Sequence, residues 1–109
     1  MKNMVSFSIL YFVWDFQGYE LVAEGKECDG SETFIGRVSG ETKGYNQECA
    51  NLCESISTMF IVGKGEKCNF DGCKCICETS ADNGKCNKVD SSGYRLFRYD
   101  SKKYFFHFF

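Results

Sequence analysis

The sequence predicts a small disulfide-rich α+β domain that consists of a strand, a helix and a β-hairpin. Three observations support this fold class: the chain has only 109 residues, eight of them are cysteine, and several cysteines follow helix-like or strand-like spacings. A domain of this size buries too little apolar surface to be stable without additional cross-links. An even number of cysteines in a short chain indicates that disulfides provide those cross-links.

The charge balance and the apolar runs argue against several classes of function. The formal net charge is -2, from 13 basic and 15 acidic side chains, so we expect no nucleic-acid partner. No apolar run reaches the roughly 18 to 20 residues of a transmembrane helix. We expect a monomer that is not an enzyme and that needs no cofactor.

Residues 1–25 have the layout of a secretory signal peptide. Lys2 gives a positive start, residues 4–14 are almost wholly apolar, and Ala23 and Gly25 put small side chains before a cleavage site. An acidic residue ends the apolar run early, so the alternative is an N-terminal strand or helix of the mature fold. Cleavage after Gly25 removes one basic and three acidic residues, which leaves 12 of each in a secreted, extracellular chain.

The composition changes at residue 87. All eight cysteines lie in residues 26–86, which we interpret as the disulfide-linked domain, and residues 87–109 have none. This C-terminal tail carries five basic and two acidic side chains and eight aromatic ones. It contacts a membrane surface, packs back on the core, or is a poorly ordered segment without a selected role. Because the cysteines precede it, we expect its removal to cost less stability than Cys53→Ser.

Three segments of the domain show secondary-structure patterns. Residues 32–38 predict a strand, because β-branched and aromatic residues lie there between glycines. Residues 46–57 predict a short helix with Asn46 as its N-cap. Residues 59–62 are apolar and either form a strand or plug the core. The helix would place four apolar side chains on one face: Cys49, Leu52, Cys53 and Ile56.

Residues 68–78 predict a β-hairpin. Asp71 and Gly72 are a strong signal for a two-residue type I′ turn, because both central residues of that turn have positive φ. A turn at this place puts Cys68 opposite Cys75 across the hairpin.

Five cysteines form two matched patterns. Cys49 and Cys53 lie one turn apart on the helix, and Cys73, Cys75 and Cys77 alternate on one face of a strand. A disulfide needs Cα atoms about 4.4 to 6.8 Å apart. Spacings of four residues on a helix and two on a strand meet this demand twice in parallel. The patterns therefore predict two bridges that clamp the helix onto the sheet.

The order and spacing of six cysteines resemble the cysteine-stabilised αβ scaffold of defensins and scorpion potassium-channel toxins: Cys28, Cys49-x3-Cys53, Cys68-x4-Cys73-x-Cys75. The resemblance covers residues 28–86, and the signal-like leader makes secreted plant defensin-like peptides the nearest group. The chain departs from the family in a longer first gap, in an extra cysteine on the hairpin and in an acidic core. The resemblance implies three disulfides: Cys28–Cys68, Cys49–Cys73 and Cys53–Cys75.

The partners of four cysteines are not decided by these patterns: Cys28, Cys68, Cys77 and Cys86. If the three family bridges hold, Cys77 pairs with Cys86, which we favour. The alternative keeps the helix bridges and joins Cys28 to Cys86 and Cys68 to Cys77, although the last two lie diagonally across the hairpin. Thiolates in the C-x-C-x-C run would bind zinc or copper in the cytosol. In a secreted chain we expect disulfides and no metal.

The resemblance also implies a working surface on the hairpin. Channel-blocking relatives use a basic side chain there, which makes Lys67 and Lys74 candidate binding residues, although ordinary solvated lysines would look the same. Phe70 is a third candidate, or it packs on residues 59–60. His107 is the only histidine and lies far in sequence from any acidic or cysteine cluster, so we predict no catalytic residues.

The resemblance implies a secreted peptide of host defence, with antifungal action through a microbial membrane lipid or a cell-surface target. The alternative is a secreted signal or channel-blocking ligand on the same scaffold, and the near-neutral mature charge favours such a ligand over a membrane disruptor. A third interpretation is a protease inhibitor that presents an exposed loop. A shared scaffold does not decide between them.

Overall fold

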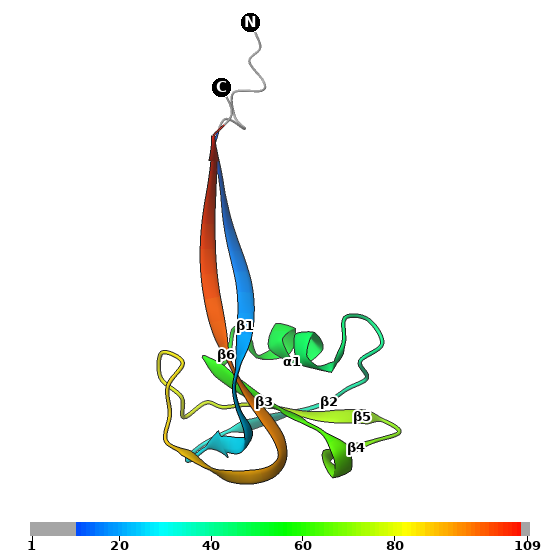
Figure 1. The fold of residues 1–109 in the computed structure, drawn as a ribbon. Coiled ribbons are helices and arrows are strands. Elements are labelled where there is room, and N and C mark those ends of the chain that lie inside the picture. Colours follow the sequence, from blue (N-terminus) through cyan, green and yellow to red (C-terminus); the bar gives the residue numbers. More distant parts are fainter. Residues whose placement is uncertain (1–10, 108–109) are drawn as a thin grey trace, which may run out of the picture.

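The computed structural model describes residues 11–107, with side chains described for residues 18–100. Six antiparallel strands form one sheet in the order β1-β6-β3-β5-β2, with β4 paired to β5, and the single described helix packs on one face (Figure 1). This confirms a small disulfide-rich α+β fold, with more strands than the sequence predicts. The elements are β1 (Tyr11–Cys28), β2 (Thr33–Val38), α1 (Tyr45–Cys53), β3 (Met59–Gly63), the 3-10 turn η2 (Gly65–Lys67), β4 (Cys68–Asn69), β5 (Gly72–Cys77) and β6 (Lys88–His107).

The central strand β3 contributes to apolar clusters on both faces of the sheet. Phe60 and Val62 belong to the cluster under α1, whereas Met59 and Ile61 belong to the cluster on the opposite face. All five residues of β3 are buried. A strand covered on both faces has no polar alternation, which explains the unbroken apolar run, and of the two interpretations of this run the strand is correct.

Helix α1 is shorter than predicted, and its buried face differs in part from the expected one. It ends at Cys53, and its buried residues are Cys49, Ala50 and Cys53. The expected burial of Cys49 and Cys53 is confirmed. Leu52 is 47% exposed and Ile56 is 43% exposed, so their placement on the buried face is wrong. Successive residues of a helix are rotated by about 100°, and the buried face is centred between Cys49 and Ala50. Leu52 points away from this face, and Ile56 lies after the end of the helix.

Glu48 fixes the loop before α1, and the prediction that Asn46 is the N-cap of the helix is wrong. Gly44 is the N-cap residue, and no side chain caps the helix. The Glu48 carboxylate accepts hydrogen bonds from the backbone N–H groups of Gly40, Thr42 and Lys43, at 3.0 to 3.2 Å. The bond from Gly40, followed by the others, lowers the pKa of Glu48 to about 2. The stabilisation that Glu48 contributes is therefore present above pH 4.5 and lost as the pH falls through about 2.

The N-terminal segment and the tail pair with each other. β1 pairs with β6 from Tyr11↔His107 to Cys28↔Lys88, and the two strands form a ribbon that projects away from the helix and the other strands (Figure 1). β6 also pairs with β3. It buries three side chains in the core: Tyr94, Leu96 and Phe97. This corrects the expectation that the core ends at the last cysteine.

An aromatic cluster joins β1, β3 and β6 under the helix. Phe60 stacks on Phe97 with ring centres 5.2 Å apart, and Tyr19 and Tyr99 each lie within 5.7 Å of the Phe60 ring centre. The Tyr99 hydroxyl donates to the Ala50 carbonyl of α1 at 2.5 Å. Part of the tail thus packs back on the core, one of the three interpretations given above. The aromatic side chains from residue 104 onward lie outside the described side chains.

We expect Phe97→Ala to destabilise the protein by about 3 to 5 kcal/mol, because it leaves a cavity in this cluster. Val89→Ala on the same strand is the control, since Val89 is 39% exposed, and it should cost less than about 0.5 kcal/mol. Removal of residues 88–109 should prevent folding, which reverses the expected ranking of this truncation and Cys53→Ser. Urea unfolding measures these costs. A truncated chain with an unchanged midpoint would show that β6 lies outside the core.

Cleavage after Gly25 stays a prediction, and it would remove most of strand β1. Gly25 has a φ of 68° and lies at a register shift between Glu24 and Lys26. Cleavage there would leave only the last three residues of β1 paired with β6. N-terminal sequencing of secreted protein should find Lys26 first. A secreted chain that begins at Met1 would instead make β1 a strand of the mature fold.

Candidate functional site

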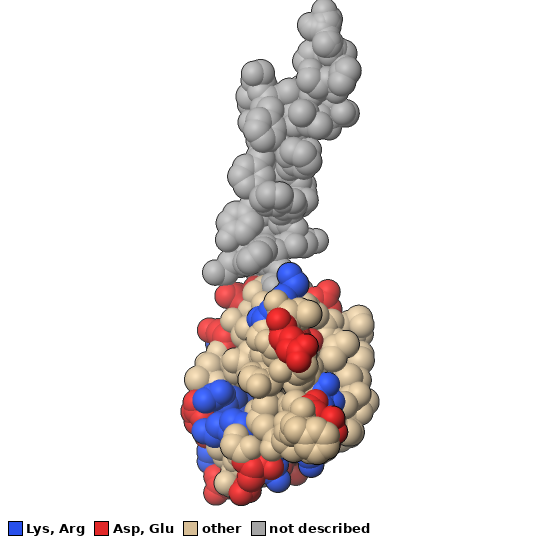
Figure 2. Space-filling view, turned by 90° about the vertical axis from the view of Figure 1, so that its right-hand side faces the viewer, with Lys and Arg blue, Asp and Glu red and all other residues tan. Residues whose placement is uncertain are grey.

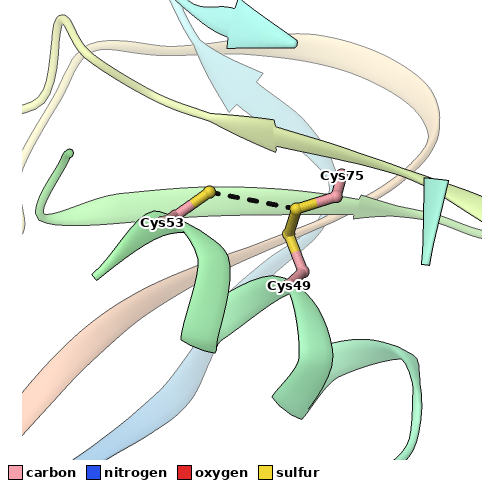
Figure 3. Close-up of side chains that lie close together, drawn as sticks. All are labelled: Cys49, Cys53 and Cys75. Carbon is pink, nitrogen blue, oxygen red and sulfur yellow. Dashed lines mark hydrogen bonds between the residues drawn. A yellow bond between two sulfur atoms is a disulfide. The ribbon is translucent and has the colours of Figure 1, made fainter. Parts of the chain in front are cut away.

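Two disulfides clamp α1 onto β5. Cys49 is bonded to Cys75 and Cys53 to Cys77, with Cα separations of 5.5 and 5.4 Å. Figure 3 shows the Cys49–Cys75 disulfide with the sulfur of Cys53 beside it, and the Sγ atoms of Cys53 and Cys75 are 3.9 Å apart. The structure contains the two parallel bridges that the spacings predict, but they reach β5 two residues later than the resemblance implies.

The tip of the β4–β5 hairpin lies one residue earlier than predicted. Asn69 pairs with Gly72, so Phe70 and Asp71 form the turn. Asp71 is not among the residues with positive φ, which excludes a type I′ turn centred on Asp71 and Gly72. The Asn69 side-chain oxygen accepts a hydrogen bond from the Asp71 N–H at 2.8 Å. Asparagine at the first position and glycine at the fourth position of a four-residue turn are typical of a type I turn.

This shift of the turn decides the disulfide pairing. Cys68 lies opposite Cys73 in place of Cys75, and the two form a disulfide with Cα atoms 4.0 Å apart. Because Cys73 is used within the hairpin, the helix cysteines pair with the next two on β5. Cys28 is bonded to Cys86, as in the alternative pairing. Five expected pairs are therefore wrong: Cys28–Cys68, Cys49–Cys73, Cys53–Cys75, Cys77–Cys86 and Cys68–Cys77.

All eight cysteines are oxidised, which determines their chemistry. The sulfur atoms of Cys49, Cys53 and Cys75 lie within 4.8 Å of one another, but each belongs to a disulfide. Cysteine binds a metal as a thiolate, and a sulfur in a disulfide is not a thiolate. This cluster is therefore a structural clamp. Four disulfides are typical of proteins from an oxidising, extracellular environment. In the described part of the chain, no helix has the length and apolar character needed to cross a bilayer.

Phe70 is the most exposed large apolar side chain of the described residues. It is 96% exposed, so it does not pack on residues 59–60. The Arg37 guanidinium holds the turn from β2, because its Nη1 donates to the Lys67 carbonyl at 3.1 Å and to the Gly72 carbonyl at 2.9 Å. Sequence reasoning missed Arg37, since only the pairing of β2 with β5 brings it to the turn. The result is an exposed aromatic ring on a fixed base.

Lys67 and Lys74 lie on either side of the turn in the chain, in η2 and on β5. The Lys67 ammonium lies 5.4 Å from the ring centre of Tyr94, a cation–π contact, and its stem runs close to Gly93. Lys74 is half-buried on β5 and pairs in register with Arg37. Seen from the side of the turn, basic groups are interspersed with acidic ones and form no single basic patch (Figure 2).

A hollow of about 380 Å³ lies between the start of α1 and the base of the β4–β5 hairpin. Three of its lining residues are basic: Lys43, Lys64 and Arg95. Glu24 of β1 pairs with Lys64 at 2.5 Å and with Arg95 at 3.1 Å. The hydrogen bonds from Lys64 and then Arg95 lower the pKa of Glu24. Glu24 therefore neutralises two of the three cationic groups of the hollow.

The contact of the turn with β2 gives a test of its geometry. A Cβ atom at Gly72 would lie 2.2 Å from the Val38 carbonyl oxygen, and Gly72 has a φ of 113°. We expect Gly72→Ala to cost more than about 3 kcal/mol, because a backbone clash adds to the strain of positive φ. Gly65→Ala is the control, since Gly65 also has positive φ but has open space around it, and it should cost about 1 kcal/mol. Equal losses in urea unfolding would contradict the observed contact.

No family model, curated protein or solved structure matches this chain. The described residues form a small cysteine-rich α+β domain with four disulfides, two of which join the helix to the sheet. The resemblance to the cysteine-stabilised αβ scaffold rests on the cysteine spacing and on the clamp between helix and strand.

Proposed function

We propose that this protein is a secreted peptide of the cysteine-stabilised αβ, defensin-like type. Its role in this proposal is host defence, by binding an anionic lipid on the surface of a fungal cell. The observation that carries the proposal is Phe70, which is 96% exposed on a turn fixed by the Cys68–Cys73 disulfide and by Arg37. A rigid contact loses little conformational entropy on binding.

The chemistry of the turn supports an amphipathic target. Burial of a phenylalanine side chain in a target contributes about 1.5 to 3 kcal/mol. Because Phe70 is exposed, its insertion into a target removes no contact from the core. Arg37, Lys67 and Lys74 lie at the base of the turn. An apolar tip with cationic groups behind it is suited to the boundary between acyl chains and anionic headgroups.

The basic hollow beside the hairpin adds a second contact in this proposal. Cleavage after Gly25 removes Glu24 and leaves Lys64 and Arg95 without the carboxylate that neutralises them. Cleavage also removes Tyr19, which lines the hollow, and what remains would present three cationic groups to a phosphate. Processing of the leader thus increases the attraction for an anionic surface, and we expect the mature chain to bind anionic vesicles more tightly than the full chain.

The second candidate is a secreted signalling or channel-blocking ligand on the same scaffold. The mixture of acidic and basic groups around the turn favours recognition of one shaped partner over broad attraction to a membrane (Figure 2). A lytic action is the least supported, because lysis depends on a strong cationic surface.

Phe70→Ala should weaken binding to phosphatidylcholine vesicles that contain phosphatidic acid by about 10- to 100-fold, which corresponds to the loss of about 1.5 to 3 kcal/mol. It should weaken fungal growth inhibition in parallel. The control is Phe34→Ala on β2, because Phe34 is also exposed, at 57%, and lies away from the turn. Vesicle flotation and growth assays measure the effects. The additional changes Lys67→Gln and Lys74→Gln should abolish both activities with the disulfides unchanged.

Equal binding by the Phe70→Ala and Phe34→Ala variants would show that the turn is not the working surface. Loss of current block in electrophysiology by Phe70→Ala, without any vesicle binding by the parent protein, would favour the channel ligand. A protein that neither inhibits fungal growth nor binds these vesicles would overturn the defence proposal.

A further inference from the structure

Three glutamates from separate segments meet beside Cys28. Glu27 lies at the end of β1, Glu32 immediately before β2, and Glu78 immediately after β5. One carboxylate oxygen of each lies within 4.8 Å of the other two. Like charges at this distance repel, so an arrangement without a compensating group would cost stability.

The backbone around these glutamates is held in place by hydrogen bonds that do not involve them. The Ser80 N–H donates to the Ser31 carbonyl at 2.9 Å, and the Thr79 hydroxyl donates to the Ser31 hydroxyl at 3.3 Å. These bonds join the turn that carries Glu32 to the turn that carries Glu78. The three carboxylates are therefore brought together by the fold.

Glu78 is fully buried and only half satisfied. Its Oε2 accepts a hydrogen bond from the Cys28 N–H at 2.5 Å. No N–H or hydroxyl group of the described residues donates to Oε1, and the neighbouring group is the Glu32 carboxyl. None of the four ion pairs between described residues includes Glu27, Glu32 or Glu78. A buried oxygen of this kind costs free energy unless a proton or a cation compensates it.

We propose that Glu27, Glu32 and Glu78 bind a calcium ion. Calcium takes oxygen ligands at about 2.3 to 2.6 Å, so ligands on opposite sides of the ion lie up to about 5 Å apart. The 4.8 Å limit for the three carboxylate oxygens agrees with this size. Glu32 is exposed, which leaves the outer side of the site open for water to complete the six to eight ligands that calcium needs.

Calcium suits this site better than magnesium does. Magnesium demands near-ideal octahedral geometry at about 2.0 to 2.1 Å and usually keeps several waters, whereas calcium accepts irregular carboxylate sets. We expect a dissociation constant of about 10⁻⁴ to 10⁻³ M, the range of extracellular calcium modules. All three glutamates follow Gly25, so the site is present both before and after the cleavage predicted above. The site does not depend on the proposed function.

The test uses the oxidised full chain, first treated with a chelator and then titrated with calcium chloride near neutral pH. Calorimetry should find one calcium per chain, and the thermal unfolding midpoint should rise with calcium concentration. Glu78→Gln should remove both responses, and Glu32→Gln should weaken binding at least about tenfold. The matched control is Glu66→Gln in η2, because this glutamate lies outside the cluster, and it should respond like the parent chain.

Three results would overturn the proposal. The first is no heat and no midpoint shift in the parent chain at millimolar calcium, which would mean that Glu78 keeps a proton. The second is an equal shift with magnesium chloride, which would mean general screening. The third is an equal calcium response in the parent chain and the Glu32→Gln variant. This last variant keeps the test decisive if Glu78→Gln does not fold, because Glu32 is exposed.

Discussion

Two disulfides between α1 and β5 hold the helix on the sheet and thereby fix the positions of the neighbouring strands. A helix of nine residues is too short to be stable alone, and the two bridges fix it to the sheet at both ends of one turn. Each closes a loop that spans about 25 residues, with separations of 26 and 24, and is worth about 3 kcal/mol. With α1 fixed, β5 becomes the strand against which β2, β3 and β4 align.

The two ends of β5 have different chemical characters. At its start, the turn exposes Phe70 above Arg37 and the Cys68–Cys73 bridge. At its end, the chain buries Glu78 next to Cys28 and close to two other carboxylates. The rigid sheet between these ends keeps both sites in place. The proposed recognition at the turn and the proposed cation binding at the opposite end can therefore be tested by separate substitutions.

Local patterns predicted much of the fold. The β-branched and aromatic residues between two glycines predicted a strand over residues 32–38, where β2 spans Thr33–Val38. Alternation put the three hairpin cysteines on one face, and the helical spacing of Cys49 and Cys53 predicted the parallel bridges. The candidate site was predicted in part, because Phe70 is exposed at the turn. Arg37, Glu24 and the glutamate cluster were not foreseen, since each depends on contacts between segments far apart in sequence.

The sequence by itself determined the size class, the need for disulfides and the types of the short elements, because these depend on composition and on spacings within one element. The tertiary structure decided the disulfide partners and the place of β6. A shift of the turn by one residue changes every pairing along the hairpin, and so it changes which cysteines remain for the helix. β6 has no cysteine, so no spacing pattern marks it as part of the core. In the structure, Leu96 and Phe97 of β6 pack on opposite faces of the sheet. Whether a strand is buried on both faces depends on the elements that pack against it, and the sequence of that strand alone does not specify them.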